Sequence, residues 1–162
     1  MAHGFHIDIA APALLETSRF IARKLTVNDL VKDYDAVMSS VDHLRGVFGP
    51  GDDWPEGLTL EEDLVDLGWH QKEFELGRSF AYTVMNPDES QCLGCFYVNP
   101  STRQGYDAEV VVWVRASEID SGLDGHLYES VRNWIASDWP LSSVAYPGRE
   151  ISWEAWQSLP LD

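Results

Sequence analysis

The sequence predicts an α/β domain, of the α+β kind, in which helices flank a central mixed and mainly antiparallel sheet. Three observations lead to this fold class. The chain has 162 residues, a length typical of one domain. Apolar residues make up 44% of it, which is enough to fill a core. Strand-like apolar runs occur between runs with helical spacing. We expect a flexible N-terminal segment over residues 1–18 and one domain over residues 19–162.

The first part of the chain predicts one strand and two helices. Residues 20–25 form an apolar run typical of a strand, and Thr26 follows it as the N-cap of a helix. Residues 49–57 combine Gly, Pro and Asp in a pattern that cannot extend a helix, so a loop is expected there. Thr59 begins a capping box, and a second helix is expected to run from there to about residue 76. The stripe that should share one face of this second helix consists of Leu60, Leu64, Leu67, Gln71 and Phe74.

The next runs predict a hairpin and a third strand. Residues 80–85 and 92–98 are strand-like and are joined by Asn-Pro-Asp-Glu-Ser, which favours a turn, so we expect them to pair antiparallel. Residues 107–115 form another strand-like run that is rich in Val and Trp. Its nearly continuous apolarity indicates that both faces of the sheet are covered.

The last part predicts a helix, a final strand and a short tail. After a loop over residues 116–121, apolar residues recur at helical spacing. Residues 141–146 can form the last strand, and the intervening helix favours a parallel pairing with the strand before it. Residues 151–159 carry Trp153 and Trp156 at helical spacing and are expected to form one short amphipathic turn. The helix residues that should dock on the sheet are Leu123, Leu127, Val131, Trp134 and Ile135.

The charge of the chain argues against two classes of partner. With 27 acidic and 11 basic side chains, the formal net charge is −16 at pH 7. Polyphosphate backbones and anionic lipids bind clustered Lys and Arg, so neither nucleic acid nor a membrane surface is expected as a partner. The first 18 residues lack the basic start and long apolar core of a secretory signal. We therefore expect a cytoplasmic protein.

The two cysteines, Cys92 and Cys95, are spaced Cys-x-x-Cys within a strand-like run. Positions three apart in a regular strand point to opposite faces, so the two thiols are not expected to share a metal ion. The sequence has no second pair that would complete a tetrahedral zinc site. We expect buried structural thiols and no metal site.

Four stretches of the sequence are similar to a known family. They are Phe-Ile-Ala-Arg-Lys-Leu-Thr-Val-Asn-Asp at 20–29, Gln-Cys-Leu-Gly-Cys-Phe-Tyr-Val at 91–98, Asp-Ala-Glu-Val-Val-Val-Trp-Val-Arg at 107–115 and Ser-Gly-Leu-Asp-Gly-His-Leu at 121–127. With the order strand, helix, helix, three strands, helix and strand, the chain resembles the GNAT superfamily of acyl-CoA-dependent N-acetyltransferases. The resemblance covers most of residues 20–146 and implies a GNAT-like fold with acetyl-CoA as co-substrate.

The resemblance also implies where acetyl-CoA binds. In that family the fourth strand offers backbone groups to pantetheine, and a Gln/Arg-x-x-Gly-x-Gly/Ala loop wraps the pyrophosphate at a helix N-terminus. Gly122 keeps the first glycine of that loop, whereas Ile119 stands at its basic or amide position and Asp124 at its second small position. The N–H groups at a helix start attract phosphate, but a carboxylate beside them repels it. The segment is thus either a cofactor cradle or a GNAT-shaped helix start that never binds CoA. The residues that the resemblance assigns to the cofactor are Val112, Trp113, Val114, Arg115, Ser121, Gly122, Asp124 and Gly125.

Each residue with an expected role in chemistry also has a structural alternative. Glu109 is the first choice for general base, because GNAT enzymes often place a carboxylate on this strand; its alternative is a hydrogen bond at a strand end. Tyr146 can protonate the leaving thiolate or pack in the core. Trp54 lines the acceptor side of a pocket or anchors its loop. Arg115 reaches a cofactor phosphate or is an ordinary surface arginine.

The leading hypothesis is an N-acetyltransferase that moves an acetyl group from acetyl-CoA to a small or peptide amine. The alternative is a non-catalytic binding or interaction protein that kept the fold and does not bind acyl-CoA. A homodimer through an edge strand or the Trp-containing tail is also possible, because exposed aromatic side chains often mark contacts.

Overall fold

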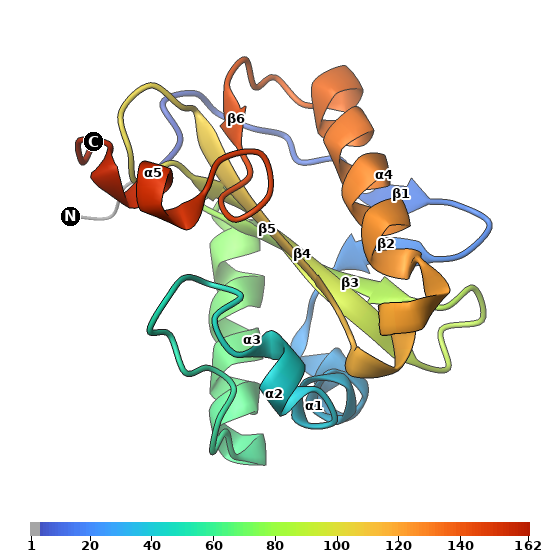
Figure 1. The fold of residues 1–162 in the computed structure, drawn as a ribbon. Coiled ribbons are helices and arrows are strands. Elements are labelled where there is room, and N and C mark those ends of the chain that lie inside the picture. Colours follow the sequence, from blue (N-terminus) through green and yellow to red (C-terminus); the bar gives the residue numbers. More distant parts are fainter. Residues whose placement is uncertain (1–3) are drawn as a thin grey trace.

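Six strands form one sheet in the order β1-β2-β3-β4-β5-β6 (Figure 1). The structure is a computed structural model and describes residues 4–162. Neighbouring strands are antiparallel except β5 and β6, which are parallel. The strands are β1 (Leu14–Glu16), β2 (Ile21–Lys24), β3 (Phe80–Met85), β4 (Cys92–Pro100), β5 (Ala108–Val114) and β6 (Val144–Ala145).

Helices cover both faces of the sheet. α4 packs on one face, and α1, α2 and α3 pack on the other (Figure 1). The predicted α+β class, with a mixed and mainly antiparallel sheet, is therefore confirmed. Over residues 4–162 no helix combines the length and apolarity needed to cross a bilayer. The helices are α1 (Leu30–Met38), α2 (Val41–Leu44), α3 (Leu60–Glu75), α4 (Leu123–Asp138) and α5 (Trp153–Ser158), with 3₁₀ turns η1 (Val27–Asp29) and η2 (Ala116–Ser121).

The predicted strand pairings are confirmed. β3 and β4 form the antiparallel hairpin, with Tyr82 opposite Phe96. The last strand is parallel to β5, with Ala108 opposite Val144. It is much shorter than the expected range of residues 141–146, because only two residues pair before the chain turns away at Pro147.

Part of the N-terminal segment that we expected to be flexible belongs to the sheet. β1 pairs with β2, and Leu15 lies opposite Ala22. Phe5 stacks on Phe80 at a ring distance of 5.7 Å. The expectation of flexibility up to residue 18 therefore does not hold for these residues, because apolar side chains attach them to the core. Residues 1–3 lie outside the described part of the chain.

The inward face of α3 differs from the predicted stripe. Leu60 and Leu64 are 47% and 41% exposed, whereas Asp63 is 3% and Leu67 2% exposed. The helix begins as predicted, because the Glu62 N–H donates to the Thr59 hydroxyl over 3.2 Å. It is rotated about its axis, however, so that a carboxylate faces inward in place of two leucines. As a result of this rotation, Asp63 lines a cavity.

The two cysteines are buried free thiols, as predicted, but they lie on the same face of the sheet. β4 has a bulge: Met85 pairs with Cys92 and Val84 with Gly94, so that one residue of β4 is unpaired in the ladder. The bulge cancels the alternation expected for a regular strand. Burial raises the pKa of Cys92 to about 12, so this thiol is not poised for reaction.

The tryptophans of the tail pack inside the molecule. Trp153 lies against Gly148, where a side chain on the glycine would come within 2.5 Å of the indole nitrogen. Trp156 is 4% exposed and meets Tyr106 edge to face. The tail therefore packs on its own domain, with Trp156 buried and Trp153 partly exposed.

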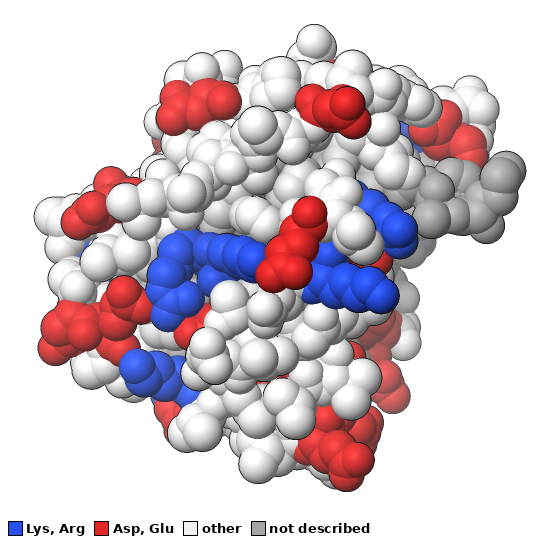
Figure 2. Space-filling view, turned by 180° about the vertical axis from the view of Figure 1, so that it is seen from behind, with Lys and Arg blue, Asp and Glu red and all other residues white. Residues whose placement is uncertain are grey.

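Basic side chains occupy a limited part of the surface. In Figure 2 acidic side chains are spread widely, whereas basic ones gather in a band across the face seen from behind. The basic side chains of β2 are paired with carboxylates: Arg23 contacts Asp29 at 2.9 Å, and Lys24 contacts Glu75 at 2.9 Å. Buried Asp29 is thus neutralised by a cation, unlike the carboxylates described below.

Truncation of Leu127 tests the core between α4 and the sheet. Leu127 has no exposed surface, so Leu127→Ala is expected to lower the free energy of unfolding by about 2–5 kcal/mol. The matched variant Leu64→Ala removes a side chain that is 41% exposed and should change it by less than about 1 kcal/mol. Urea denaturation of both variants measures the difference. Equal losses would contradict the observed rotation of α3.

Candidate functional site

A cleft opens between β5 and β6 because the two strands pair only at Ala108 and Glu109. Beyond these residues β5 continues to Val114, whereas the segment after β6 turns away from it through Pro147 and Gly148. The resulting cavity has a volume of about 200 Å³. Its walls are Val47, Val110, Val111, Val112, Pro147, Gly148, Arg149 and Trp153.

The N-terminus of α4 follows the open end of this cleft. Gly122 precedes the helix with φ = 77°, a left-handed conformation that favours glycine. Apart from the adjoining residues and the helix backbone, no atom of the described chain lies within 4 Å of a Cβ placed at Gly122 or Gly125, so there is free space beside both glycines. The Ser121 hydroxyl accepts from the Leu123 N–H over 3.2 Å. The N–H groups of Asp124 and Gly125 also lie in the first turn and have no acceptor within the helix.

Asp124 does not stand alone at this helix start. Its two carboxylate oxygens accept from Arg149 Nη1 and Nη2 over 2.9 and 2.8 Å. The same guanidinium donates to the carbonyl oxygen of Val112 over 3.2 Å, so it crosses the cleft from the turn after β6 to β5. A second arginine, Arg19, donates to the Ser121 carbonyl over 3.1 Å. Two arginines from outside the loop thus flank the start of α4, and Asp124 pairs with one of them.

The side chain of Arg115 makes its contacts away from this helix start, where the resemblance implied a role for it. Its side chain is 7% exposed and donates to the Cys92 carbonyl over 3.0 Å and to Asp35 Oδ2 over 3.1 Å. It also donates to Ser39 Oγ over 3.2 Å. Arg115 therefore joins the end of β5 to α1 and is not a surface arginine, whereas its phosphate role stays a prediction. Nη1 and Nη2 of the buried guanidinium donate to these acceptors, while Nε is buried without a partner among the described residues.

Glu109 lies at the closed end of the cleft, on the face of the sheet that carries α3. One carboxylate oxygen accepts from the Thr102 N–H over 3.2 Å and from the Thr102 hydroxyl over 2.9 Å. Glu109 also lines a cavity of about 490 Å³ with His70 and Tyr97. The hydrogen bond at a strand end is therefore observed, and Glu109 also lines a cavity, while its role as general base stays a prediction.

Tyr146 lies on the other face. It is 3% exposed, belongs to the core beneath α4 and meets Tyr128 edge to face. Burial raises the pKa of its phenol, which makes proton donation harder. The sheet separates Tyr146 from Glu109, so the structure does not bring these two predicted residues together.

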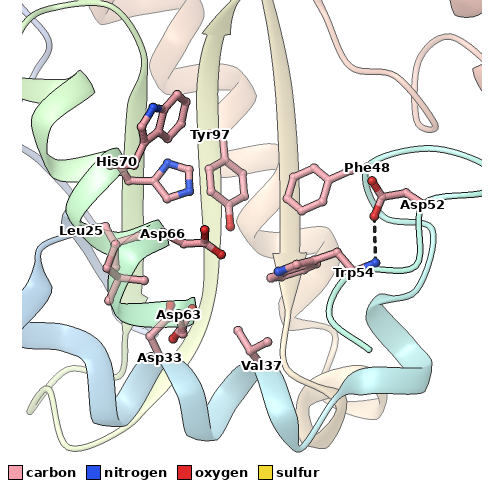
Figure 3. A pocket seen from close by; sticks show the side chains of 12 residues that line it. Leu25, Asp33, Val37, Phe48, Asp52, Trp54, Asp63, Asp66, His70 and Tyr97 are labelled. Carbon is pink, nitrogen blue, oxygen red and sulfur yellow. Dashed lines mark hydrogen bonds between the residues drawn. The ribbon is translucent and has the colours of Figure 1, made fainter. Parts of the chain in front are cut away.

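A second cavity, of about 300 Å³, lies between α1, α3 and the loop that carries Trp54 (Figure 3). Four carboxylates line it: Asp33 from α1, Asp63 and Asp66 from α3, and Asp52 from the loop, which accepts from the Trp54 N–H over 2.9 Å. Aromatic rings and three aliphatic side chains complete the lining, from Phe48, Trp54, Trp69, His70, Tyr97, Leu25, Val37 and Leu67. We call this cavity the acidic pocket. Trp54 thus lines a pocket and also packs at 6.1 Å from Trp113, which anchors its loop; its role toward an acceptor stays a prediction.

The two deepest carboxylates of the acidic pocket lie side by side. Asp33 is 4% and Asp63 3% exposed. Burial, and next the charge of Asp63, raise the pKa of Asp33 well above its ordinary value of 3.8. Burial also raises the pKa of Asp63, against a hydrogen bond from Asp33 that lowers it. In the absence of a ligand, we infer that Asp33 holds a proton and Asp63 carries the charge.

His70 stands between the two cavities. Its ring lies 5.4 Å from that of Tyr97, and burial lowers the pKa of His70 to about 4, so the imidazole is neutral at pH 7. His70, Tyr97, Phe48 and Trp69 line both the acidic pocket and the cavity of Glu109. The two cavities therefore adjoin along these four side chains.

Sequence reasoning missed Asp33, Asp63, Asp66 and Arg149. Asp33 and Asp63 carried a usable signal, because each lies four residues from an apolar core position, Val37 and Leu67 respectively. A carboxylate inside a helical core stripe is rarely tolerated without a partner or a function. Arg149 carried no such signal, since its partners Val112 and Asp124 are distant in sequence.

No family model matches this sequence, and no curated protein matches it. Solved structures do match. The ribosomal-protein-S5-alanine acetyltransferase from Vibrio fischeri is similar with a TM-score of 0.59 at 15% identity, over 76% of this chain and 67% of that one. RimL, a ribosomal L7/L12 alpha-N-protein acetyltransferase in complex with coenzyme A, matches with a TM-score of 0.62 at 14% identity, over 76% and 67%. An acetyltransferase from Thermus thermophilus matches with a TM-score of 0.53 at 17% identity, over 74% and 70%. At these identities the likeness concerns the fold.

Replacement of Asp33 tests the buried carboxyl pair. Because the pKa of Asp33 is raised on folding, ionisation opposes folding above pH 3.8, and the wild type loses stability as pH rises through the folded pKa. Asp33→Asn lacks this titration. It is therefore expected to be more stable than wild type at pH 7, with a difference that disappears below pH 3.8.

Urea denaturation between pH 3 and pH 8 measures this difference. Asp53→Asn, in an exposed loop, serves as the control and should follow the wild-type curve. If Asp33→Asn is no more stable than wild type at pH 7, the buried pair does not oppose folding, and the inferred destabilisation by Asp33 and Asp63 is wrong.

Proposed function

Because the chain has the fold of GNAT acetyltransferases, we propose that it transfers an acetyl group from acetyl-CoA to the nitrogen of an amine. One observation carries this proposal: β5 and β6 diverge next to a helix start that is open at Gly122. RimL, which has a similar fold, binds coenzyme A. The proposal includes peptide amines as acceptors, because two of the similar structures are acetyltransferases of ribosomal proteins.

The residues around the cleft fit acetyl-CoA if Arg149 moves. The backbone of β5 from Val112 to Val114 would hold pantetheine, and the first-turn N–H groups of α4 would hold the diphosphate. Arg19 and Arg149 supply the positive charge that Ile119 does not. Arg149 must leave the Val112 carbonyl for this to happen, and its side chain is 27% exposed, which leaves it a path toward solvent.

Bound acetyl-CoA would supply a thioester whose carbonyl carbon the amine attacks, so that the C–N bond forms and the C–S bond breaks. CoA would leave as its thiolate, which would take a proton from solvent. Glu109 would accept the proton that the attacking nitrogen loses, with its carboxylate oriented by Thr102. His70 is neutral at pH 7, so its ring would not repel an amine that enters with a positive charge. Tyr146 has no part in this scheme, because it is buried on the opposite face.

The second candidate function, a non-catalytic protein, is not favoured by the fold comparisons, but one contact bears on it. Arg149 occupies the Val112 carbonyl, and Asp124 places a carboxylate in the cradle. If that arrangement never opens, the chain is a binding or interaction protein that does not bind acyl-CoA. The two candidates differ in a single measurable property, the affinity for acetyl-CoA.

Replacement of Asp124 tests the cofactor cradle. Asp124→Asn removes a negative charge beside the expected diphosphate and releases Arg149. It is expected to tighten acetyl-CoA binding about tenfold, which corresponds to about 1.4 kcal/mol. Calorimetric titration measures the affinity, and Glu129→Gln, an exposed change farther along α4, should have no effect. If neither wild type nor Asp124→Asn binds acetyl-CoA at millimolar concentration, the second candidate function replaces the first.

Replacement of Glu109 tests the general base. Glu109→Gln keeps the shape and an acceptor for Thr102 but cannot take a proton, so kcat is expected to fall by about 10²–10⁴. Steady-state assays with acetyl-CoA and an amine acceptor measure it, and exposed Glu154→Gln on α5 is the control. An unchanged kcat would assign the proton transfer to another group.

A further inference from the structure

The acidic pocket concentrates negative charge without a matching cation. Among the described residues that line it there is no Lys or Arg, and Asp33, Asp63 and Asp66 form no ion pair with any residue from 4 to 162. Asp29, on the neighbouring turn, is buried to a similar degree but receives two hydrogen bonds from Arg23. The buried carboxylates of the pocket therefore lack the basic partner that Asp29 has.

One oxygen of the pocket also lacks a donor. Asp63 Oδ2 is fully enclosed and accepts no hydrogen bond from an N–H group or hydroxyl of the described chain. A buried carboxylate in this state costs stability, because it has lost water and gained no partner. Figure 3 places Asp63 beside Asp33 at one end of the cavity, with Asp66 projecting between them and Tyr97. A donor that enters the cavity would meet these groups together.

The walls indicate what kind of donor fits. Trp54, Phe48 and Tyr97 present rings around the carboxylates, and aromatic faces attract organic cations. The neighbouring imidazole of His70 is neutral at pH 7 and does not repel a cation. A metal ion fits less well, because over residues 4–162 no three His, Cys, Asp or Glu side chains converge in a metal-binding arrangement.

We propose that the acidic pocket binds the ammonium group of an aliphatic amine, with Asp63 and Asp66 as its charged partners. The ammonium group supplies three donors, one of which can reach the unpaired Asp63 Oδ2, and its alkyl chain lies along the aromatic walls. Entry of the cation also favours loss of the proton that Asp33 holds. The groups that face Asp33 are Asp29, Asp63, Asp66, Cys92, Cys95 and Tyr97.

The pocket also specifies the acceptor of the proposed reaction, an extension that rests on the proposed function. Carboxylates around an ammonium group keep it protonated, and a protonated nitrogen has no lone pair with which to attack a thioester. The nitrogen that reacts must then be a different one. Because the acidic pocket adjoins the cavity of Glu109 along His70 and Tyr97, an amine with two nitrogens can extend from one to the other. The acceptor is thus a diamine or polyamine, anchored by one ammonium group and acetylated at another nitrogen.

Binding is tested without acetyl-CoA. The probes are 1,4-diaminobutane, 1,6-diaminohexane and butylamine, with 1,4-butanediol as the neutral analogue, in calorimetric titrations at pH 7.5. The amines are expected to bind at least tenfold more tightly than the diol. Asp63→Asn and Asp33→Asn should each weaken amine binding at least tenfold, whereas Glu61→Gln, an exposed change on α3, should not. Thermal melting shows whether each variant is folded, and Asp66→Asn, at the exposed rim, provides a variant that does not disturb the buried pair.

Three results would overturn the ammonium site. They are equal binding of diol and amine, unchanged amine binding in all three Asp→Asn variants, and displacement of the amine by micromolar Mg²⁺, Ca²⁺ or Zn²⁺. The last result would make the pocket a metal site.

Acetylation is tested separately, with acetyl-CoA and mass spectrometry of the products. We expect monoacetylated diamines, little acetylated butylamine, and a KM for diamine that rises at least tenfold in Asp63→Asn. Amine binding without any acetylated product would leave the ammonium site standing and remove the proposed function. Acetylated product with an unchanged KM in Asp63→Asn would leave the proposed function standing and remove the pocket as the acceptor anchor. Equal acetylation of butylamine and the diamines would overturn the requirement for two nitrogens.

Discussion

The short parallel pairing between β5 and β6 is the constraint on which the candidate site depends. Only Ala108 and Glu109 of β5 are paired, so the rest of that edge keeps backbone groups that β6 does not cover. Such groups need partners, and Arg149 meets one of them at Val112. The same divergence places Glu109 at the closed end of the cleft and the start of α4 at its open end. A longer β6 would close the cleft and separate these features.

Charge is arranged differently on the two sides of this region. At the start of α4, Arg19 and Arg149 reach in from distant parts of the chain, which suits an anionic ligand. In the acidic pocket, carboxylates face aromatic rings with no basic side chain among the described lining residues, which suits a cationic one. Reactants of opposite charge would therefore approach the β5 region along separate routes. The buried pair of Asp33 and Asp63 opposes folding at neutral pH, and a bound ammonium ion would offset that cost.

The parts of the site that sequence reasoning found are local. Glu109, Val112 and Gly122 lie on one strand and the helix start that follows it, and the resemblance to the GNAT superfamily implied a shared site for them. The parts that it missed depend on distant contacts. Arg115 was expected at a phosphate or on the surface, and its side chain joins β5 to α1. Tyr146 was expected to protonate the thiolate or to pack in the core, and it lies in the core beneath α4. The contacts of Arg115 could not be predicted, because they depend on which partners the fold brings to the side chain.

The sequence by itself determined the order of helices and strands from β2 onward, the antiparallel hairpin of β3 and β4, and the parallel pairing of β6, because apolar periodicity, turn residues and connection length act over short distances. Only the tertiary structure decided the rotation that turns Asp63 inward, the bulge that brings Cys92 and Cys95 to one face, and the pairing of Asp124 with Arg149. Periodicity shows that a helix has an apolar side, but its exact rotation depends on how all neighbouring elements fill the core together. The ion pair between Asp124 and Arg149 likewise forms only once the fold has brought these two residues together.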